Sequence, residues 1–183
     1  MKENLKKNIL ITGDPGAGKT TLVREVLGEL GVKPGGYLTR AMPERGVKTW
    51  CEIISLTAGV VPERAIFASM DRKSPPHLCG MGVSATELEA VGAVALERAM
   101  EISPLIVMDE IGHMEIVSRR FQNAVLACLD SLTPVLGVIK IEHGPFVDRI
   151  KARPDIVLIK LSNVNYDVTK HYVKAVISSL LRL

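Results

Sequence analysis

The chain has 183 residues, of which 47% are apolar and 23% are charged, values that are ordinary for a globular protein. We therefore expect residues 1–183 to form a single domain with a sizeable buried core. The net charge of +3 is small and spread along the chain, so it does not indicate a nucleic-acid-binding protein, which usually concentrates its basic residues in one patch.

The N-terminal part of the chain combines short apolar runs with one segment of helical period. Asn8–Thr12 predicts a buried strand, and Thr20–Leu30 predicts a helix that ends at Gly31. Two more strands are predicted at residues 35–39 and 49–56. Because the gap between them is short, these two strands could pair as an antiparallel hairpin.

The middle of the chain predicts a strand, a loop and a helix. The strand covers residues 65–69, and the loop covers residues 71–82, which contain two prolines and two glycines. A helix then runs from Ser84 to about Met100, because Ser84 and Glu87 match the S-x-x-E capping box of a helix N-terminus.

Strands and helices alternate regularly in the C-terminal part. We expect strands at residues 104–109, 135–141 and 156–161, and helices at residues 115–132, 146–152 and 166–181. This alternation is typical of an α/β fold in which helices cover both faces of a mostly parallel sheet. The predicted fold is therefore a three-layer αβα domain, with one possible antiparallel hairpin.

Residues Gly13–Thr20 read GDPGAGKT and match the phosphate-loop pattern G-x-x-x-x-G-K-[S/T], known as Walker A, between a predicted strand and a predicted helix. The glycines let the backbone amides turn inward around an anion, and the helix N-terminus adds partial positive charge. We expect Lys19 to reach the β- and γ-phosphates of a nucleoside triphosphate. The Thr20 hydroxyl is expected to bind Mg²⁺, a hard cation that prefers oxygen ligands.

A second motif is the apolar segment Leu105–Met108, which ends in Asp109 and Glu110. Ligands of open parallel sheets collect at the carboxyl ends of the strands. If this strand neighbours Asn8–Thr12, Asp109 faces the metal held by Thr20 and binds it through water, the Walker B role. Glu110 could orient and polarise an attacking water, which favours hydrolysis. The candidate catalytic residues are therefore Lys19 and Glu110, and the candidate metal ligands are Thr20 and Asp109.

The segments GDPGAGKT, GGYLTR, IISLTAG, LIVMDEIGHME and ARPDI together resemble a family of small P-loop nucleoside-triphosphatases. The family includes thermostable NTPases of archaea and bacteria and a relative called cancer-related nucleoside-triphosphatase. The resemblance runs from about Asn8 to Asp155, and its most specific parts are DEIGHME and Gly36-Tyr37-x-Thr39. It implies a RecA-like core and slow, Mg²⁺-dependent hydrolysis of ATP, GTP and other NTPs to NDP and phosphate, with Glu110 in the water-activating position.

The resemblance also implies nucleotide contacts from the phosphate loop and from the strand before Gly112. The candidate nucleotide-binding residues are Gly13, Asp14, Pro15, Gly16, Ala17, Gly18, Lys19, Thr20, Thr21, Leu105, Ile106, Val107, Met108, Asp109, Glu110, Ile111 and Gly112. This chain departs from the family at two positions. Val138 stands where the family commonly has a polar residue, and Tyr166 follows Asn165 where the family has an arginine after the asparagine.

Three functions are compatible with these motifs: a nucleoside-triphosphatase with broad base tolerance, a nucleotide or small-molecule kinase, and a nucleotide-dependent switch with little hydrolysis. A kinase would need an acceptor pocket and an arginine-rich lid, whereas a switch would tolerate the loss of Glu110. An arginine finger would accelerate hydrolysis greatly. The candidate fingers are Arg40, Arg72, Arg149 and Arg153.

The cysteines and the apolar runs bear on location. Cys51, Cys79 and Cys128 form no CxxC pair, so neither a disulfide framework nor a zinc site is expected. No apolar stretch approaches the roughly 20 residues of a membrane span, and Ile9–Ile11 is too short for the apolar region of a signal peptide. We therefore expect a cytoplasmic protein that binds nucleoside triphosphates, without membrane or nucleic-acid partners. The sequence identifies no protein partner.

Overall fold

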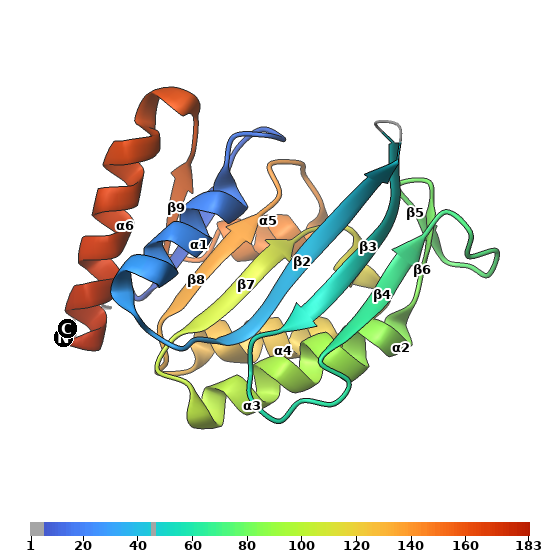
Figure 1. Ribbon diagram of the computed structural model, residues 1–183, viewed down its shortest axis with the longest axis horizontal. Helices are drawn as coiled ribbons and strands as arrows, with labels where there is room; N and C mark the ends of the chain where they lie inside the picture. The colour runs from blue at the N-terminus through green and yellow to red at the C-terminus, as the bar shows by residue number, and fades with distance from the viewer. Residues whose placement is uncertain (1–5, 45–46) are drawn as a thin grey trace.

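The computed structural model describes residues 6–44 and 47–183, with the backbone alone at positions 43, 44, 47, 48 and 115. Within these residues, nine strands form one sheet in the order β5-β6-β4-β3-β2-β7-β8-β1-β9 (Figure 1). The strands are β1 Asn8–Thr12, β2 Gly35–Glu44, β3 Val47–Ser55, β4 Arg64–Ser69, β5 His77–Leu78, β6 Met81–Val83, β7 Ile106–Ile111, β8 Val135–Ile139 and β9 Ile156–Lys160.

Helices cover both faces of the sheet, so the predicted three-layer αβα architecture is confirmed (Figure 1). The helical segments are α1 Lys19–Leu30, α2 Ala85–Glu87, the π-helix η1 Leu88–Ala93, α3 Val94–Ile102, the 3-10 helix η2 Met114–Val117, α4 Arg119–Asp130, α5 Pro145–Lys151, the 3-10 helix η3 Asn163–Asn165 and α6 Tyr166–Leu181. None of the helices described is long and apolar enough to cross a membrane.

The two faces of the sheet are set by the alternation of side chains along each strand. In β1, Ile9 and Ile11 pack in the apolar layer that contains α1 and α6. Leu10, which lies between them, packs in the opposite layer with residues of α3, α4 and α5. Both apolar layers are fully buried around β1, as expected for a central strand of a parallel sheet.

The sheet is parallel in one half and antiparallel in the other. Strands β2, β7, β8, β1 and β9 run parallel, whereas β2 and β3 form the predicted antiparallel hairpin. Strands β4, β6 and β5 extend the antiparallel half. The predicted loop at residues 71–82 was therefore wrong in part, because β5 and the start of β6 lie within it. Strand β5 pairs with β6, and β6 pairs in turn with β4.

Two predicted helices are divided in the structure. The helix expected from Ser84 consists of α2, η1 and α3, and only half of its capping box forms, because the Ser84 amide donates to the Phe67 carbonyl at 2.7 Å. The helix expected at residues 115–132 is also interrupted. Ser118 accepts a hydrogen bond from the Phe121 amide and begins α4, after the separate helix η2.

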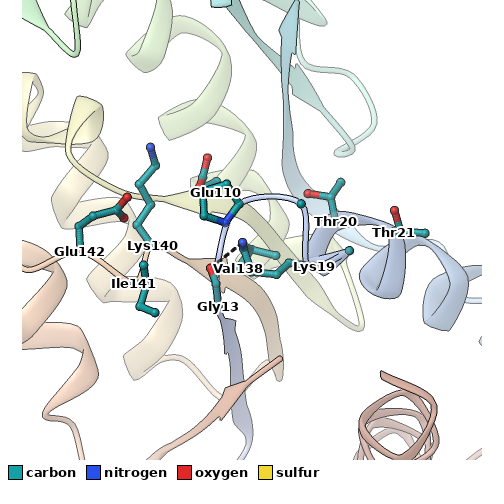
Figure 2. Close-up of a pocket in the computed structure, with 12 residues that line it drawn as sticks. Gly13, Lys19, Thr20, Thr21, Glu110, Val138, Lys140, Ile141 and Glu142 are labelled. Atoms are coloured by element: carbon teal, nitrogen blue, oxygen red, sulfur yellow. Dashed lines mark hydrogen bonds between the residues drawn. The ribbon is translucent and has the colours of Figure 1, made fainter. Parts of the chain in front are cut away.

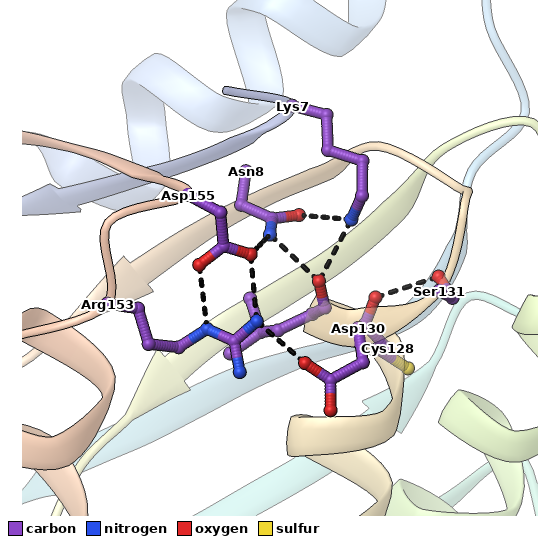
Figure 3. A network of polar contacts seen from close by, with 8 residues as sticks. Lys7, Asn8, Cys128, Asp130, Ser131, Arg153 and Asp155 are labelled. Carbon is purple, nitrogen blue, oxygen red and sulfur yellow. Dashed lines mark hydrogen bonds and ion pairs between the residues drawn. The ribbon is translucent and has the colours of Figure 1, made fainter. Parts of the chain in front are cut away.

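A network of polar side chains lies at the end of the sheet opposite the phosphate loop (Figure 3). The buried Asn8 amide donates to the Leu129 carbonyl at 2.9 Å and to Asp155 at 3.0 Å. Arg153 donates to both oxygens of Asp155 and to Asp130, and its guanidinium holds the pKa of the Asp155 carboxyl below the ordinary range. The ARPDI segment therefore satisfies buried polar groups where β1, β8 and β9 begin.

Gly36 lies on β2, the strand at which the parallel and antiparallel halves of the sheet join. Gly36 has a φ of +98°, and a Cβ at this position would overlap the carbonyl oxygen of Val107 on β7. The Gly36 amide donates to the Thr57 hydroxyl at 2.8 Å, and that hydroxyl donates to the Ala95 carbonyl at 2.8 Å. The GGY and LTAG motifs thus hold β2 against both β7 and α3.

Replacing Gly36 with alanine should destabilise the protein by about 3 kcal/mol, because the new Cβ would strain the backbone and clash with β7. Gly28→Ala is the matched control. Gly28 is exposed within α1 with open space around it, and alanine there should raise the free energy of unfolding by about 1 kcal/mol. Urea denaturation of both variants measures the two free energies of unfolding. A Gly36→Ala variant as stable as the parent would contradict the requirement for glycine where β2 packs against β7.

Candidate active site

A cleft of about 440 Å³ opens at the carboxyl ends of the parallel strands (Figure 2). This volume lies in the range typical of small-molecule sites. The residues that line it are Gly13, Pro15, Gly16, Gly18, Lys19, Thr20, Thr21, Glu110, Val138, Lys140, Ile141 and Glu142.

The phosphate loop forms one wall of the cleft. Gly13 has a φ of +144°, and a Cβ there would lie 2.5 Å from the Leu161 carbonyl oxygen, so the loop needs glycine at its start. The Lys19 ammonium donates to the carbonyls of Gly13 and Asp14, both at 2.8 Å, and is thereby held over the loop. Helix α1 begins at Lys19, so its N-terminal amides and this ammonium face the same space.

Thr20 and Asp109 contact each other directly, although β1, which leads to Thr20, is not adjacent to β7, which carries Asp109. Strand β8 lies between β1 and β7, so the condition that the two strands be adjacent is not met. The Thr20 hydroxyl nevertheless donates to Oδ1 of Asp109 at 3.0 Å. The contact forms because α1 carries Thr20 away from β1 and packs over β8, where Leu22 and Val138 belong to one apolar layer.

Asp109 lies in surroundings that favour a cation. Its side chain is buried, and burial raises the pKa of the carboxyl to about 6, against the opposing effect of the Thr20 hydrogen bond. Among the described residues, Oδ2 of Asp109 has no hydrogen-bond partner. A buried carboxylate with one unsatisfied oxygen, next to a threonine hydroxyl, fits Mg²⁺ or a metal-bound water.

Glu110 projects into the cleft one residue beyond Asp109 (Figure 2). Its backbone carbonyl accepts a hydrogen bond from the Tyr37 hydroxyl at 3.3 Å, and the Tyr37 ring packs against Phe121 at 5.3 Å between centroids. Tyr37 is buried, so this contact fixes the end of β7 from β2. Sequence reasoning identified the Gly36-Tyr37 motif without assigning Tyr37 this positioning role.

A side cavity of about 40 Å³ adjoins the cleft beside Glu110. A volume of this size has room for a few water molecules. Glu110 and Lys140 line both the cleft and the side cavity, so they stand at the junction of the two. The other lining residues are Thr39, Arg40, Ala41, Cys51, Phe67 and Met114.

The structure brings most of the predicted loop residues to the cleft but not the strand before Asp109. The side chains of Leu105–Met108 are fully buried in the sheet and do not line the cleft. Their contribution is to carry Asp109 and Glu110 to its edge. Asp14, Ala17, Asp109, Ile111 and Gly112 are also absent from the cleft lining described, although Asp109 contacts the lining residue Thr20.

Other lining residues come from the end of β8 and were not predicted as site residues. They are Val138, Lys140, Ile141 and Glu142. The available signal was the position of these residues in or just after the last part of a predicted strand, which does not reveal that β8 lies between the two motif strands.

None of the four candidate arginine fingers lines the cleft among the residues that the structure describes. Arg153 lies in the network at the opposite edge of the sheet. Arg72 pairs with Glu87 at 3.5 Å, and Arg40 pairs with Glu52 at 2.9 Å while its guanidinium lies 5.9 Å from the centroid of the Trp50 ring. Arg40 does line the side cavity.

A family model described as NTPase matches residues 8–174 of the chain. The nucleoside-triphosphatase THEP1 of Thermotoga sp. (strain RQ2) is 41% identical over 157 residues, which cover 86% of this chain and 87% of that protein. The protein of the same description from Thermofilum pendens (strain DSM 2475 / Hrk 5) is 36% identical and covers 96% of this chain and 97% of its own length.

Two solved structures share the fold. The crystal structure of THEP1 from Aquifex aeolicus superimposes with a TM-score of 0.80 at 32% identity and covers 93% of this chain and 98% of its own. The solution structure of a human cancer-related nucleoside triphosphatase gives a TM-score of 0.75 at 25% identity and covers 94% of this chain and 98% of its own. The likeness therefore extends over almost the whole fold.

Asp109→Asn should stabilise the metal-free protein at neutral pH. The folded-state pKa of about 6 lies above the ordinary value of 3.8, so the parent protein loses stability as pH rises from 3.8 through 6. In buffer with EDTA we expect the variant to gain on the order of 2 kcal/mol at pH 7.5 and almost nothing below pH 4. Urea denaturation at both pH values measures the free energy of unfolding. An equal gain in stability at both pH values would contradict the raised pKa of Asp109.

Proposed function

This chain belongs to the NTPase family, and we propose that it hydrolyses nucleoside triphosphates to nucleoside diphosphates and inorganic phosphate, with Mg²⁺ as its cofactor. The observation that carries the proposal is the contact of Thr20 with Asp109 at 3.0 Å, at the edge of a cleft that Thr20, Lys19 and Glu110 line. Anion-binding amides, a metal site and a carboxylate near the reacting phosphate are the parts that phosphoryl transfer to water requires.

The phosphate loop would bind the polyphosphate through its amides, the α1 N-terminus and Lys19. The Lys19 ammonium would exchange its contacts with the Gly13 and Asp14 carbonyls for β- and γ-phosphate oxygens. Thr20 and Asp109 would hold Mg²⁺, directly and through water respectively. Mg²⁺ bound there supplies charge neutralisation on the β- and γ-phosphates.

Glu110 would hold the attacking water and accept its proton. The water oxygen forms a bond to the γ-phosphorus as the bond to the β,γ-bridging oxygen breaks, and the nucleoside diphosphate leaves with that oxygen. The side cavity beside Glu110, at about 40 Å³, is on the scale of a few waters. That size favours water as the phosphoryl acceptor over a kinase substrate.

Broad base tolerance follows if binding is centred on the phosphates, because the loop contacts no base. The side-chain amide of Asn165, the residue before the departure at Tyr166, is engaged within its own segment: it donates to the Lys160 carbonyl at 2.9 Å and accepts from the Ser162 amide at 2.8 Å. We therefore propose that ATP, GTP, CTP and UTP are all substrates.

We further propose one domain spanning residues 1–183 and a location in the cytoplasm, where Mg²⁺ and nucleoside triphosphates are both available. The single sheet built from strands between Asn8 and Lys160 supports the first point. Cys79 and Cys128 are not joined in a disulfide, which suits a compartment in which thiols stay reduced. Neither nucleic acid nor membrane is part of the proposal.

Lys19→Ala should abolish triphosphate binding, because it removes the ammonium that faces the β- and γ-phosphates. Isothermal titration with a non-hydrolysable ATP analogue and Mg²⁺ measures the loss. Lys33→Met is the control, since Lys33 is exposed beyond α1 and outside the cleft lining. Retained micromolar binding by Lys19→Ala would refute the loop assignment.

Glu110→Gln should preserve nucleotide binding and reduce phosphate release by about 10²–10⁴-fold, because the amide cannot accept the proton of water. The assay is phosphate release from ATP, GTP, CTP and UTP, with and without Mg²⁺ and with no acceptor added. Release by the parent without an acceptor supports hydrolysis, whereas release that depends on an acceptor indicates a kinase. Release by Glu110→Gln at the parental rate would exclude Glu110 as the water-orienting group.

A further inference from the structure

Lys140 enters the active site from the strand that separates the two motifs. It follows the last residue of β8, and β8 lies between β1, which leads into the phosphate loop, and β7, which carries Asp109 and Glu110. The Lys140 amide donates to the Ile111 carbonyl at 2.9 Å, so the backbone at this point is tied to the end of β7. Its side chain extends beside Glu110 into the cleft (Figure 2).

Gly112 gives the Lys140 side chain its path. A Cβ on Gly112 would lie 2.8 Å from Cδ of Lys140 and 3.0 Å from both Cγ and Cε. The aliphatic stem of the lysine therefore runs through the space that the missing side chain leaves. This contact gives a physical reason for glycine in the DEIGHME segment, where the backbone itself does not require a positive φ.

Positive charge converges on this side of the cleft. The pKa of the Glu142 carboxyl lies below its ordinary value, first because of a hydrogen bond from its own backbone and further because of the charges of Lys140, His113 and Lys19. Lys140 also lines the side cavity together with Glu110. A phosphate whose attacking water sat at Glu110 would therefore lie within reach of Lys140.

Within the described part of the chain, Lys19 and Lys140 are the cationic side chains that line the cleft, and no arginine does so. The phosphate loop engages the nucleotide from the β1 side, so Lys19 and Lys140 would approach the terminal phosphate from different strands. Val138 carries no polar group, which leaves the β8 side of the cleft with Lys140 as its cationic group.

We propose that Lys140 contacts the γ-phosphoryl group and stabilises its charge during transfer to water, the role that an arginine finger fills in other phosphoryl-transfer proteins. Gly112 is the positioning residue that keeps the lysine stem in place. The inference rests on the proposed hydrolysis, and it assigns to this chain a catalytic cation that the phosphate-loop and acidic motifs do not contain.

The direct test is Lys140→Met, which keeps the length of the stem and removes the charge, compared with Lys140→Arg and Lys33→Met. We expect kcat for phosphate release to fall by about 10²-fold in Lys140→Met, to recover at least partly in Lys140→Arg and to stay unchanged in Lys33→Met. Affinity for ADP should be the same in all four proteins, because the diphosphate lacks the γ-phosphate. A kcat within twofold of the parent in Lys140→Met would overturn the proposal.

Gly112→Ala tests the positioning role through a double-mutant cycle. Alone it should lower kcat at least about fivefold by displacing the lysine, and in the Lys140→Met background it should have no further effect. An equal loss in both backgrounds would overturn the positioning role. Circular dichroism and thermal denaturation establish that each variant is folded.

The test also separates this inference from the proposed function. If the parent releases no phosphate, hydrolysis itself is refuted. Lys140 is then judged by the ratio of affinities for a non-hydrolysable ATP analogue and for ADP. A ratio that falls at least about tenfold in Lys140→Met supports the γ-phosphate contact, and an unchanged ratio refutes it.

Discussion

The proposed active site depends on the contact between the Thr20 hydroxyl and Asp109, which joins the start of α1 to the end of β7 across the intervening strand β8. This Thr20–Asp109 junction lies between the groups that line the cleft. The phosphate loop lies on one side of it and Glu110 on the other. The end of β8 emerges between them, which is why residues from three different strand ends line one cleft.

The surrounding fold keeps this junction rigid while leaving one of its groups unsatisfied. Tyr37 holds the Glu110 backbone from β2, and Gly36 lets β2 approach β7 closely enough for that contact. Asp109, by contrast, is buried with a raised pKa and with one oxygen that has no partner among the described residues. A buried carboxyl of this kind is costly to the metal-free protein and becomes favourable when a cation binds.

The sequence predicted those parts of the fold and site that depend on local patterns. The phosphate loop, β1 and α6 follow from glycine spacing, apolar runs and helical period, and all three lie where they were expected. Strands β5 and β6 were missed because both are very short, and because β6 depends on pairing with β4, whose residues lie further away in the chain. Lys140 was missed for the same reason: its place in the cleft follows from the order of strands and from a contact with Gly112, and neither has a local signature.

The position of the metal tests the central claim most directly. A crystal of the protein with a non-hydrolysable ATP analogue and Mn²⁺ would locate the ion by its anomalous scattering. We predict an ion bound directly by the Thr20 hydroxyl and by phosphate oxygens, with Asp109 separated from it by one water molecule. An ordered triphosphate with the ion bound away from Thr20 and Asp109 would contradict the account.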